Sequence, residues 1–159
     1  MVAKAVGPPV VIRRLGPPDA SVLTLLARED ADFDLEGQGR TETPLAPRGA
    51  SAFLSDPDLL TWAAFAGQEV VGFVFCHVLR MRKEPARELL LYEIGVRSGC
   101  RRQGVGRRLV AAMVDWMRAE GIVTAWVLAG HEDAERFYEA CGFGRGAGPA
   151  TYLELTLSA

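Results

Sequence analysis

The segment RRQGVGRR, residues 101–108, places four arginines around two glycines. An apolar run ends near Arg97, and an apolar pattern with helical spacing begins after Gly104. A helix N-terminus presents unpaired backbone N–H groups and the positive end of the helix dipole. Acidic side chains stabilise that end, so these arginines oppose the helix and suit a polyanion. The segment predicts an anion site, with a pyrophosphate as the expected ligand; a solvated basic turn is the alternative.

The spacing of the glycines differs from both common phosphate-binding motifs. The chain has no G-x-x-x-x-G-K-[ST] segment, which excludes a P-loop, and its glycines do not make the G-x-G-x-x-G of a dinucleotide fold. The predicted anion site therefore belongs to neither of these two phosphate-binding classes.

Apolar periodicity predicts the elements that hold this segment. The expected strands are residues 10–15, 59–80 (a hairpin), 88–97, 122–130 and 151–158. The expected helices are residues 20–30, 48–57, 105–120 and 131–143. The strand–helix–strand order around residue 105 implies a parallel crossover, and the hairpin implies antiparallel pairing. The order predicts an α/β (α+β) chain with a mixed sheet and helices on both faces.

Length and composition suit one globular domain over residues 1–159. A net charge of −2 argues against nucleic-acid binding. Three widely spaced cysteines indicate a reducing compartment, and we expect neither disulfides nor a metal site. The start lacks a signal-peptide core and no apolar run could span a membrane, so we expect a cytoplasmic protein.

Three segments together resemble the GNAT superfamily of N-acetyltransferases. RRQGVGRRL is similar to that family's R/Q-x-x-G-x-G/A motif, with Arg101, Gly104 and Gly106 in the defining places. YEIGV (residues 92–96) resembles its central splayed strand, and AERFYEACGF (residues 134–143) its A-x-x-x-Y-x-x-x-GF helix. The similarity extends over residues 10–157. It implies the GNAT fold, a mostly antiparallel mixed sheet with a splayed parallel strand pair.

The resemblance also implies acetyl-CoA as co-substrate, with its pyrophosphate cradled by the glycine loop and its pantetheine arm along the splayed strand. The residues that this assigns to acetyl-CoA are Ile94, Gly95, Val96, Arg101, Arg102, Gln103, Gly104, Val105, Gly106 and Arg107.

In this family the amine attacks directly within a ternary complex. Glu93 is the candidate general base, because a carboxylate in an apolar strand should be buried and have a raised pKa. It could instead pair with an arginine or face solvent. Tyr138 is the candidate general acid by resemblance, or it packs against Phe137 and Phe143. His131 stands where the family often has Asn. It is expected to cap the helix or lie at the surface; a role as a base or in contact with substrate is the alternative.

The run KEPARELLLYEIGVRSGCRRQGVG resembles the aminoglycoside 3-N-acetyltransferases of type I, which implies a 3-amino acceptor. An acid-rich segment, residues 28–36, opens a long loop and would attract a polycation; a solvated acidic loop is the alternative. The candidate substrate-binding residues are Asp30, Asp32, Asp34, Glu36, Glu88, Glu132, Asp133 and Glu154.

Other acceptors remain open: a polyamine, another small amine or a protein N-terminus. A non-catalytic acyl-CoA-binding module is an alternative of another class, and the presence of both Glu93 and Tyr138 favours an enzyme. An exposed strand edge could pair two copies in a homodimer, but no pattern specifies it.

Overall fold

The computed structural model describes residues 8–33, 43–148 and 150–157. The chain forms two compact units, Met1–Leu128 and Ala129–Ala159, and each is described by itself. Within the described residues, no helix has the length and apolar character that crossing a membrane requires.

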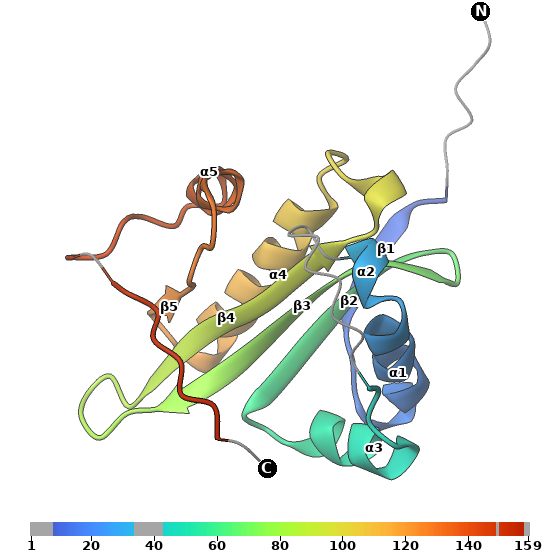
Figure 1. Cartoon of the computed structure of the whole chain (residues 1–159), viewed down its shortest axis with the longest axis horizontal. Coiled ribbons are helices and arrows are strands. Elements are labelled where there is room, and N and C mark those ends of the chain that lie inside the picture. The colour runs from blue at the N-terminus through green and yellow to red at the C-terminus, as the bar shows by residue number, and fades with distance from the viewer. Residues whose placement is uncertain (1–7, 34–42, 149, 158–159) are drawn as a thin grey trace, which may run out of the picture. The chain divides into compact units, whose positions relative to one another are not determined.

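The first unit is built on a five-stranded sheet whose strands follow one another in space as they do in sequence (Figure 1). The first four strands pair antiparallel and the last two pair parallel. This arrangement confirms the mixed, mostly antiparallel sheet with one parallel pair. The strands are β1 (Val10–Arg14), β2 (Leu59–Ala66), β3 (Glu69–Arg80), β4 (Arg87–Val96) and β5 (Ala125–Trp126).

Helices cover both faces of this sheet, as expected. Neighbouring residues of a strand point to opposite faces. A Cβ atom on Gly72 would lie 3.0 Å from Val105 of α4 (Val105–Glu120), whereas Phe73 packs edge-to-face on Phe33 of α2 (Asp30–Phe33). The α2 face also carries α1 (Ala20–Arg28) and α3 (Pro47–Ser55).

The core has one apolar layer on each face. On the α4 face, Trp62 packs edge-to-face on Trp116, and Leu109 and Met113 are fully buried. The opposite layer contains Leu15, Leu26, Phe33, Leu54, Ala63, Val70 and Phe73. The sheet is therefore buried on both faces near its middle, which fixes the position of the β4–α4 connection.

Helix α4 ends where the sequence predicted. Gly121 has φ 68°, a left-handed conformation that glycine adopts without steric cost. Its N–H donates to the Arg118 carbonyl, and the Ile122 N–H donates to the Met117 carbonyl at 2.9 Å. This pattern satisfies carbonyls that the last turn would otherwise leave unpaired.

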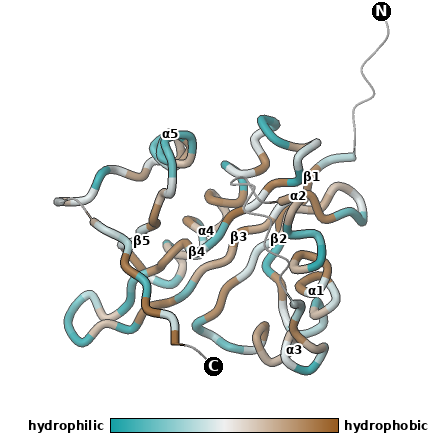
Figure 2. The backbone as a smooth tube through the Cα atoms, viewed as in Figure 1, coloured by the Kyte–Doolittle hydropathy of each residue, from teal (hydrophilic) through white to brown (hydrophobic). Residues whose placement is uncertain are grey.

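In the C-terminal part, one strand prediction was too long and another was wrong. The expected strand 122–130 is reduced to Ala125–Trp126, and residues 150–157 form no strand, although hydrophobic and hydrophilic residues alternate there (Figure 2). Tyr152 is 72% exposed and Leu155 is 86% exposed. Alternation describes the two faces of a strand, but a strand forms only where a neighbouring edge accepts its hydrogen bonds. Ser158, the last residue of that prediction, lies outside the described residues.

Gly95 of β4 lies where α2 approaches the sheet most closely. A Cβ atom there would be 2.7 Å from Cε1 of Phe73 and 2.9 Å from Cβ of Phe33. Both neighbours are buried, so neither can move without disturbing the core. The packing itself therefore requires glycine at this position.

We expect Gly95→Ala to lower the free energy of unfolding by about 1–3 kcal/mol, because the new methyl group overpacks the Phe33–Phe73 contact. Gly99→Ala is the control, since a Cβ there meets nothing within 4 Å. Urea unfolding of both variants measures the difference. Equal stability of the two variants would contradict the packing argument.

Candidate functional site

The loop between β4 and α4 opens onto the N-terminus of that helix. A 3-10 turn, η2 (Ser98–Cys100), follows β4, and Arg102 (φ 58°) and Gly104 (φ 81°) are left-handed. Gly104 is the N-cap, supplies no side-chain cap, and has no atom within 4 Å of where a Cβ would lie. Gly104 therefore offers the first N–H groups of α4 no side-chain acceptor.

The four arginines of this segment divide into two pairs. Arg101 turns inward and donates to the carbonyls of Val96 (2.9 Å) and Asp32 (3.2 Å), and Arg108 donates to the Val10 carbonyl (2.7 Å). Arg101 therefore fixes the loop to the end of β4 and to α2, and Arg108 fixes α4 to β1.

Arg102 and Arg107 are exposed and pair with no other residue in the part of the chain that the structure describes. The first turn of α4 contains no acid. Open amides and two exposed guanidinium groups form a donor set that fits a diphosphate. Gln103 closes the loop by donating from Nε2 to the Gly99 carbonyl at 3.1 Å.

A β-bulge lies in the middle of β4. Phe75 of β3 pairs with Glu93, whereas the next residue, Cys76, pairs with Leu91. Tyr92 is therefore an extra residue on β4. Its insertion changes which face the following side chains meet.

The bulge explains the position of Glu93. Leu91 is buried on the α4 face, and without an extra residue Glu93 would follow it onto that face. Instead Ile94 takes that face, pairing with Val74, and both Tyr92 and Glu93 point the other way and are exposed. The expectation that Glu93 is buried was wrong. Its role as general base stays a prediction.

Tyr92 joins an aromatic cluster on the face opposite α4. Its ring lies 5.6 Å from the Phe75 ring and 5.2 Å from the His77 ring, and Phe53 of α3 lies 5.2 Å from Phe75. Sequence analysis did not single out these residues. The signal was present in β3, where aromatic side chains occupy alternate positions from Phe73 to His77.

Arg97, at the end of β4, holds the acidic end of α1 and α2. Its guanidinium pairs with Glu29 (2.7 Å) and Asp32 (2.9 Å) and lies 4.7 Å from the centre of the Phe33 ring. The Ser98 hydroxyl donates to Asp32 at 2.5 Å. The Ser98 hydrogen bond, followed by Arg97, lowers the pKa of the Asp32 carboxyl.

The acids predicted to contact substrate therefore differ in their surroundings. Asp32 is engaged within the fold, Asp30 is half-buried in α2, and Glu88 lies half-buried in β4. Asp34 and Glu36 lie outside the described residues. Sequence treated these acids as one rim, and the structure ties at least Asp32 to the loop before α4.

The second unit contains α5 (Glu132–Ala140), which carries Tyr138. Tyr138 is buried and packs edge-to-face on Phe137 (5.3 Å) and Phe143 (5.6 Å). Nδ1 of His131 accepts from the Ala134 N–H at 3.3 Å, which confirms His131 as the helix cap. The acid role of Tyr138 stays a prediction.

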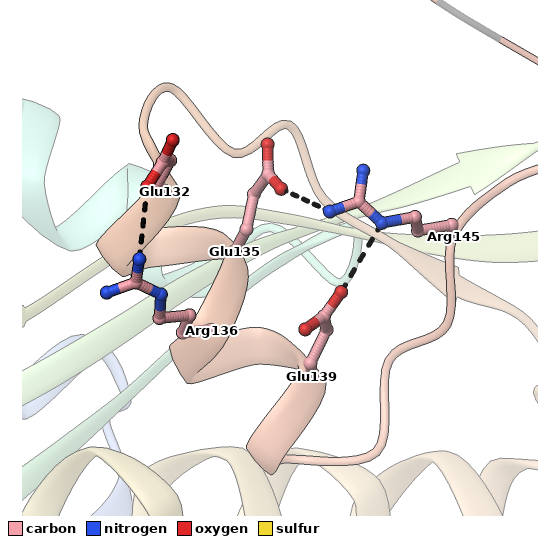
Figure 3. Close-up of a pocket in the computed structure, with 5 residues that line it drawn as sticks. All are labelled: Glu132, Glu135, Arg136, Glu139 and Arg145. Carbon is pink, nitrogen blue, oxygen red and sulfur yellow. Dashed lines mark hydrogen bonds and ion pairs between the residues drawn. The ribbon is translucent and has the colours of Figure 1, made fainter.

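Further acids of this unit are paired locally. Arg136 binds Glu132 (3.0 Å) and Asp133 (3.4 Å), and Glu154 accepts from the Tyr152 hydroxyl (2.9 Å). A hollow of about 280 Å³ on this unit is lined by Glu132, Glu135, Arg136, Glu139 and Arg145. Each of these three carboxylates pairs with one of the two arginines (Figure 3).

Cysteine and metal chemistry find no support among the described residues. The three cysteines form no disulfide with any described residue, and burial raises the pKa of the Cys76 thiol to about 12. No group of His, Cys, Asp or Glu in the described ranges could hold a metal ion.

Sequence comparison identifies relatives of this chain. The Acetyltransferase (GNAT) family model matches residues 24–143. The probable N-acetyltransferase camello of Xenopus laevis is 30% identical over 95 residues, 58% of this chain and 42% of that protein. The mycothiol acetyltransferase of Corynebacterium glutamicum is 32% identical over 117 residues, 72% of this chain and 38% of that protein. The chain thus spans about two fifths of the length of these curated relatives.

Solved structures share the fold at low sequence identity. An aminoglycoside acetyltransferase, HMB0005, from an uncultured soil metagenomic sample superposes with a TM-score of 0.83 at 17% identity, covering 94% of this chain and 99% of the other. The aminoglycoside N-acetyltransferase AAC(6')-Iy in complex with CoA gives 0.71 at 16% identity, covering 95% and 98%. A ribosomal-protein-alanine N-acetyltransferase from Brucella melitensis gives 0.70 at 20%, covering 93% and 99%. At these identities the likeness shows the fold alone.

The Asp32 contacts predict a pH-dependent stability. The folded state lowers the pKa of this carboxyl, so its contribution is complete above the unfolded value of 3.8 and is lost as the pH falls through the folded value. We expect Asp32→Asn to be less stable than the unmodified protein at neutral pH, with a gap that closes in acid. Urea unfolding across this pH range measures the gap.

The control is Asp115→Asn, which removes an exposed helix pair with Arg118 and should change stability little at any pH. A gap for Asp32→Asn that stays constant through the acid range would contradict the proposed anchoring by Arg97 and Ser98.

Proposed function

The chain belongs to the GNAT family of acetyltransferases, and on that premise we propose that it transfers the acetyl group of acetyl-CoA to a primary amine. The observation that carries the proposal is the α4 N-terminus, where the first turn without a side-chain cap and the exposed Arg102 and Arg107 offer donors that fit a diphosphate, within the family's motif. The curated relatives are longer than this chain, so their acetyltransferase activity is a hypothesis for this chain.

The residues of the loop provide different contacts for acetyl-CoA. The N–H groups of Val105, Gly106 and Arg107 would bind phosphate oxygens, and the guanidinium groups of Arg102 and Arg107 would balance their charge. Arg101 would position the loop through the Val96 carbonyl instead of binding phosphate itself. The backbone of residues 94–96 would bind the pantetheine arm, as the family resemblance implies.

Bound acetyl-CoA supplies the thioester carbonyl, and this chain must manage the protons. The amine nitrogen forms the new bond to the acetyl carbon as the carbon–sulfur bond breaks. We propose that Glu93 accepts one proton of the ammonium group, directly or through a water molecule, and that the Tyr138 hydroxyl donates its proton to the departing sulfur. The nitrogen loses a second proton as the amide forms, and a proton from solvent restores the Tyr138 hydroxyl. The products are the N-acetyl amine and CoA. Glu93 meets the amine at the surface because the bulge exposes it.

The finer proposal is an aminoglycoside acceptor, acetylated at its 3-amino group. Its support is the lead-in to the glycine loop, which resembles the type I 3-N-acetyltransferases, together with the aminoglycoside acetyltransferases among the structures of the same fold. This acceptor would use Glu88 and Asp30 with the predicted acids outside the described residues, Asp34 and Glu36.

A smaller amine is the second candidate, and the pairing of acids favours it. Asp32, Glu132 and Asp133 are each bound to an arginine, which leaves less unpaired negative charge for a polycation. A polyamine acceptor, like an aminoglycoside, would need several unpaired acids. A protein N-terminus would in addition need a groove for the peptide.

A panel of amines tests the function. Purified protein is mixed with acetyl-CoA and an aminoglycoside with a free 3-amino group, spermidine, 2-phenylethylamine or an N-terminal peptide, and release of the CoA thiol is followed. Acetylation of any amine, confirmed by mass spectrometry of the product, supports the enzyme. Binding of acetyl-CoA without acetylation of any amine would favour the non-catalytic module.

A change at Arg107 should affect ligand binding and protein stability in opposite directions, because this residue lies in the first turn of α4, where an acid stabilises the helix. We expect Arg107→Glu to raise the free energy of unfolding by about 0.3–1 kcal/mol. The same change should raise the KM for acetyl-CoA about tenfold or more, since a charge-assisted bond to phosphate is replaced by repulsion.

Arg118→Glu, in the last turn of the same helix, is the matched control. It should lower stability slightly and leave the KM for acetyl-CoA unchanged. If Arg107→Glu binds acetyl-CoA as well as the unmodified protein, the phosphate site lies elsewhere.

A further inference from the structure

The face of β3 and β4 opposite α4 carries four aromatic rings beside Glu93. Phe75 and His77 come from alternate positions of β3, Phe53 comes from α3, and Tyr92 is the extra residue of the bulge. Because Phe75 and Glu93 are directly paired, their side chains share this face. The rings therefore lie next to the group proposed to take the amine's proton.

The rings contact one another in a continuous series. Phe53 lies 5.2 Å from Phe75, Phe75 lies 4.7 Å from His77, and Tyr92 lies edge-on to both residues of β3 at 5.6 and 5.2 Å. Edge-to-face contacts such as those of Tyr92 are among the preferred arrangements of aromatic pairs. The cluster is therefore a continuous apolar surface, from which Tyr92 remains exposed.

Tyr92 is 64% exposed in the middle of the longest pair of strands. The bulge that exposes it interrupts the ladder, which costs pairing at this point of the sheet. Bulges of this kind re-aim side chains, and this one brings a tyrosine and a carboxylate to the same open face. That pairing of an apolar ring with an adjacent acid is suited to a ligand with a matching apolar group and amine.

The charges of the two strands suit a cation at this face. Glu88 pairs with Leu79 and Glu93 pairs with Phe75, so both carboxylates lie on the face of the cluster. Arg80 and Arg87 are directed to other partners, Asp58 (2.9 Å) and the Glu120 carbonyl (2.8 Å).

Aromatic rings add to this attraction, since the face of a tyrosine or phenylalanine attracts an ammonium group. One or two carboxylates beside this layer of aromatic rings fit a ligand that has one positive charge and an apolar body.

We propose that the cluster of Phe53, Phe75, His77 and Tyr92 binds the body of the acceptor, and that the acceptor is a primary alkylamine that carries an aromatic ring. This inference rests on the proposed acetyltransferase function and selects among its acceptors. The ring of the acceptor packs on Tyr92 and Phe75, and its ammonium group reaches Glu93. Tyr92 is then a specificity-determining residue, and Glu93 keeps its role in proton transfer.

Two amines that differ only by the ring test the proposal. We expect kcat/KM for 2-phenylethylamine to exceed that for ethylamine by about tenfold or more, the scale of one aromatic contact. Tyr92→Ala should remove most of this preference by raising the KM for 2-phenylethylamine, while kcat/KM for ethylamine stays within about twofold. Tyr92→Phe keeps the ring and should keep the preference. Val11→Ala, an exposed change on β1, is the control for unspecific effects.

Titration calorimetry with CoA present measures binding of both amines independently of turnover. Tighter binding of 2-phenylethylamine that Tyr92→Ala abolishes supports the inference even if no amine is acetylated, an outcome that overturns only the proposed function. Acetylation of amines with equal kcat/KM for the two probes, or a preference that survives in Tyr92→Ala, overturns the inference and leaves the acetyltransferase standing. A higher kcat/KM for an aminoglycoside than for 2-phenylethylamine also overturns it.

Discussion

The one-residue bulge at Tyr92 determines what each half of β4 can do. Alternation requires every second side chain of a strand to meet the same face, so an inserted residue reverses the faces from that point onward. The half before the bulge buries Leu89 and Leu91 against α4. In the half after it, Ile94 and Val96 take that face, and Glu93 avoids a desolvation cost that no partner there would offset. The apolar core and an exposed carboxylate are thereby compatible within one strand.

The end of β4 depends on a second constraint, the close approach of α2. The missing side chain of Gly95 lets Phe33 contact the sheet, and Arg97 then covers the Phe33 ring while pairing with Glu29 and Asp32. Arg101 donates to the Asp32 carbonyl from the other side. The loop before α4 is thus held by α2 as well as by its own strand. A site that relies on backbone amides needs this support, because amides bind anions well only when their direction is held.

The distribution of paired charge bears on the acceptor. The chain has a net charge of −2, with separate basic and acidic segments. From the number of acids alone, one would expect an acidic rim around the acceptor site. The ion pairs of Asp32, Glu132 and Asp133 show that several of these acids serve the fold or its helices. Exposed pairs contribute little stability each, but they do cancel long-range attraction for a polycation. The aromatic cluster beside Glu93 then becomes the more informative feature of the acceptor side.

The sequence by itself determined the family, the order of most elements and the ends of α4, because these depend on local spacing, capping and glycine conformation. It also indicated the capping role of His131. Only the tertiary structure decided which arginines remain exposed and that Asp32 is paired, since its partner Arg97 is distant in sequence. It also decided the exposure of Glu93 and the absence of a strand at residues 150–157. A bulge and an edge partner are properties of two strands together, and the residues of one strand do not reveal them.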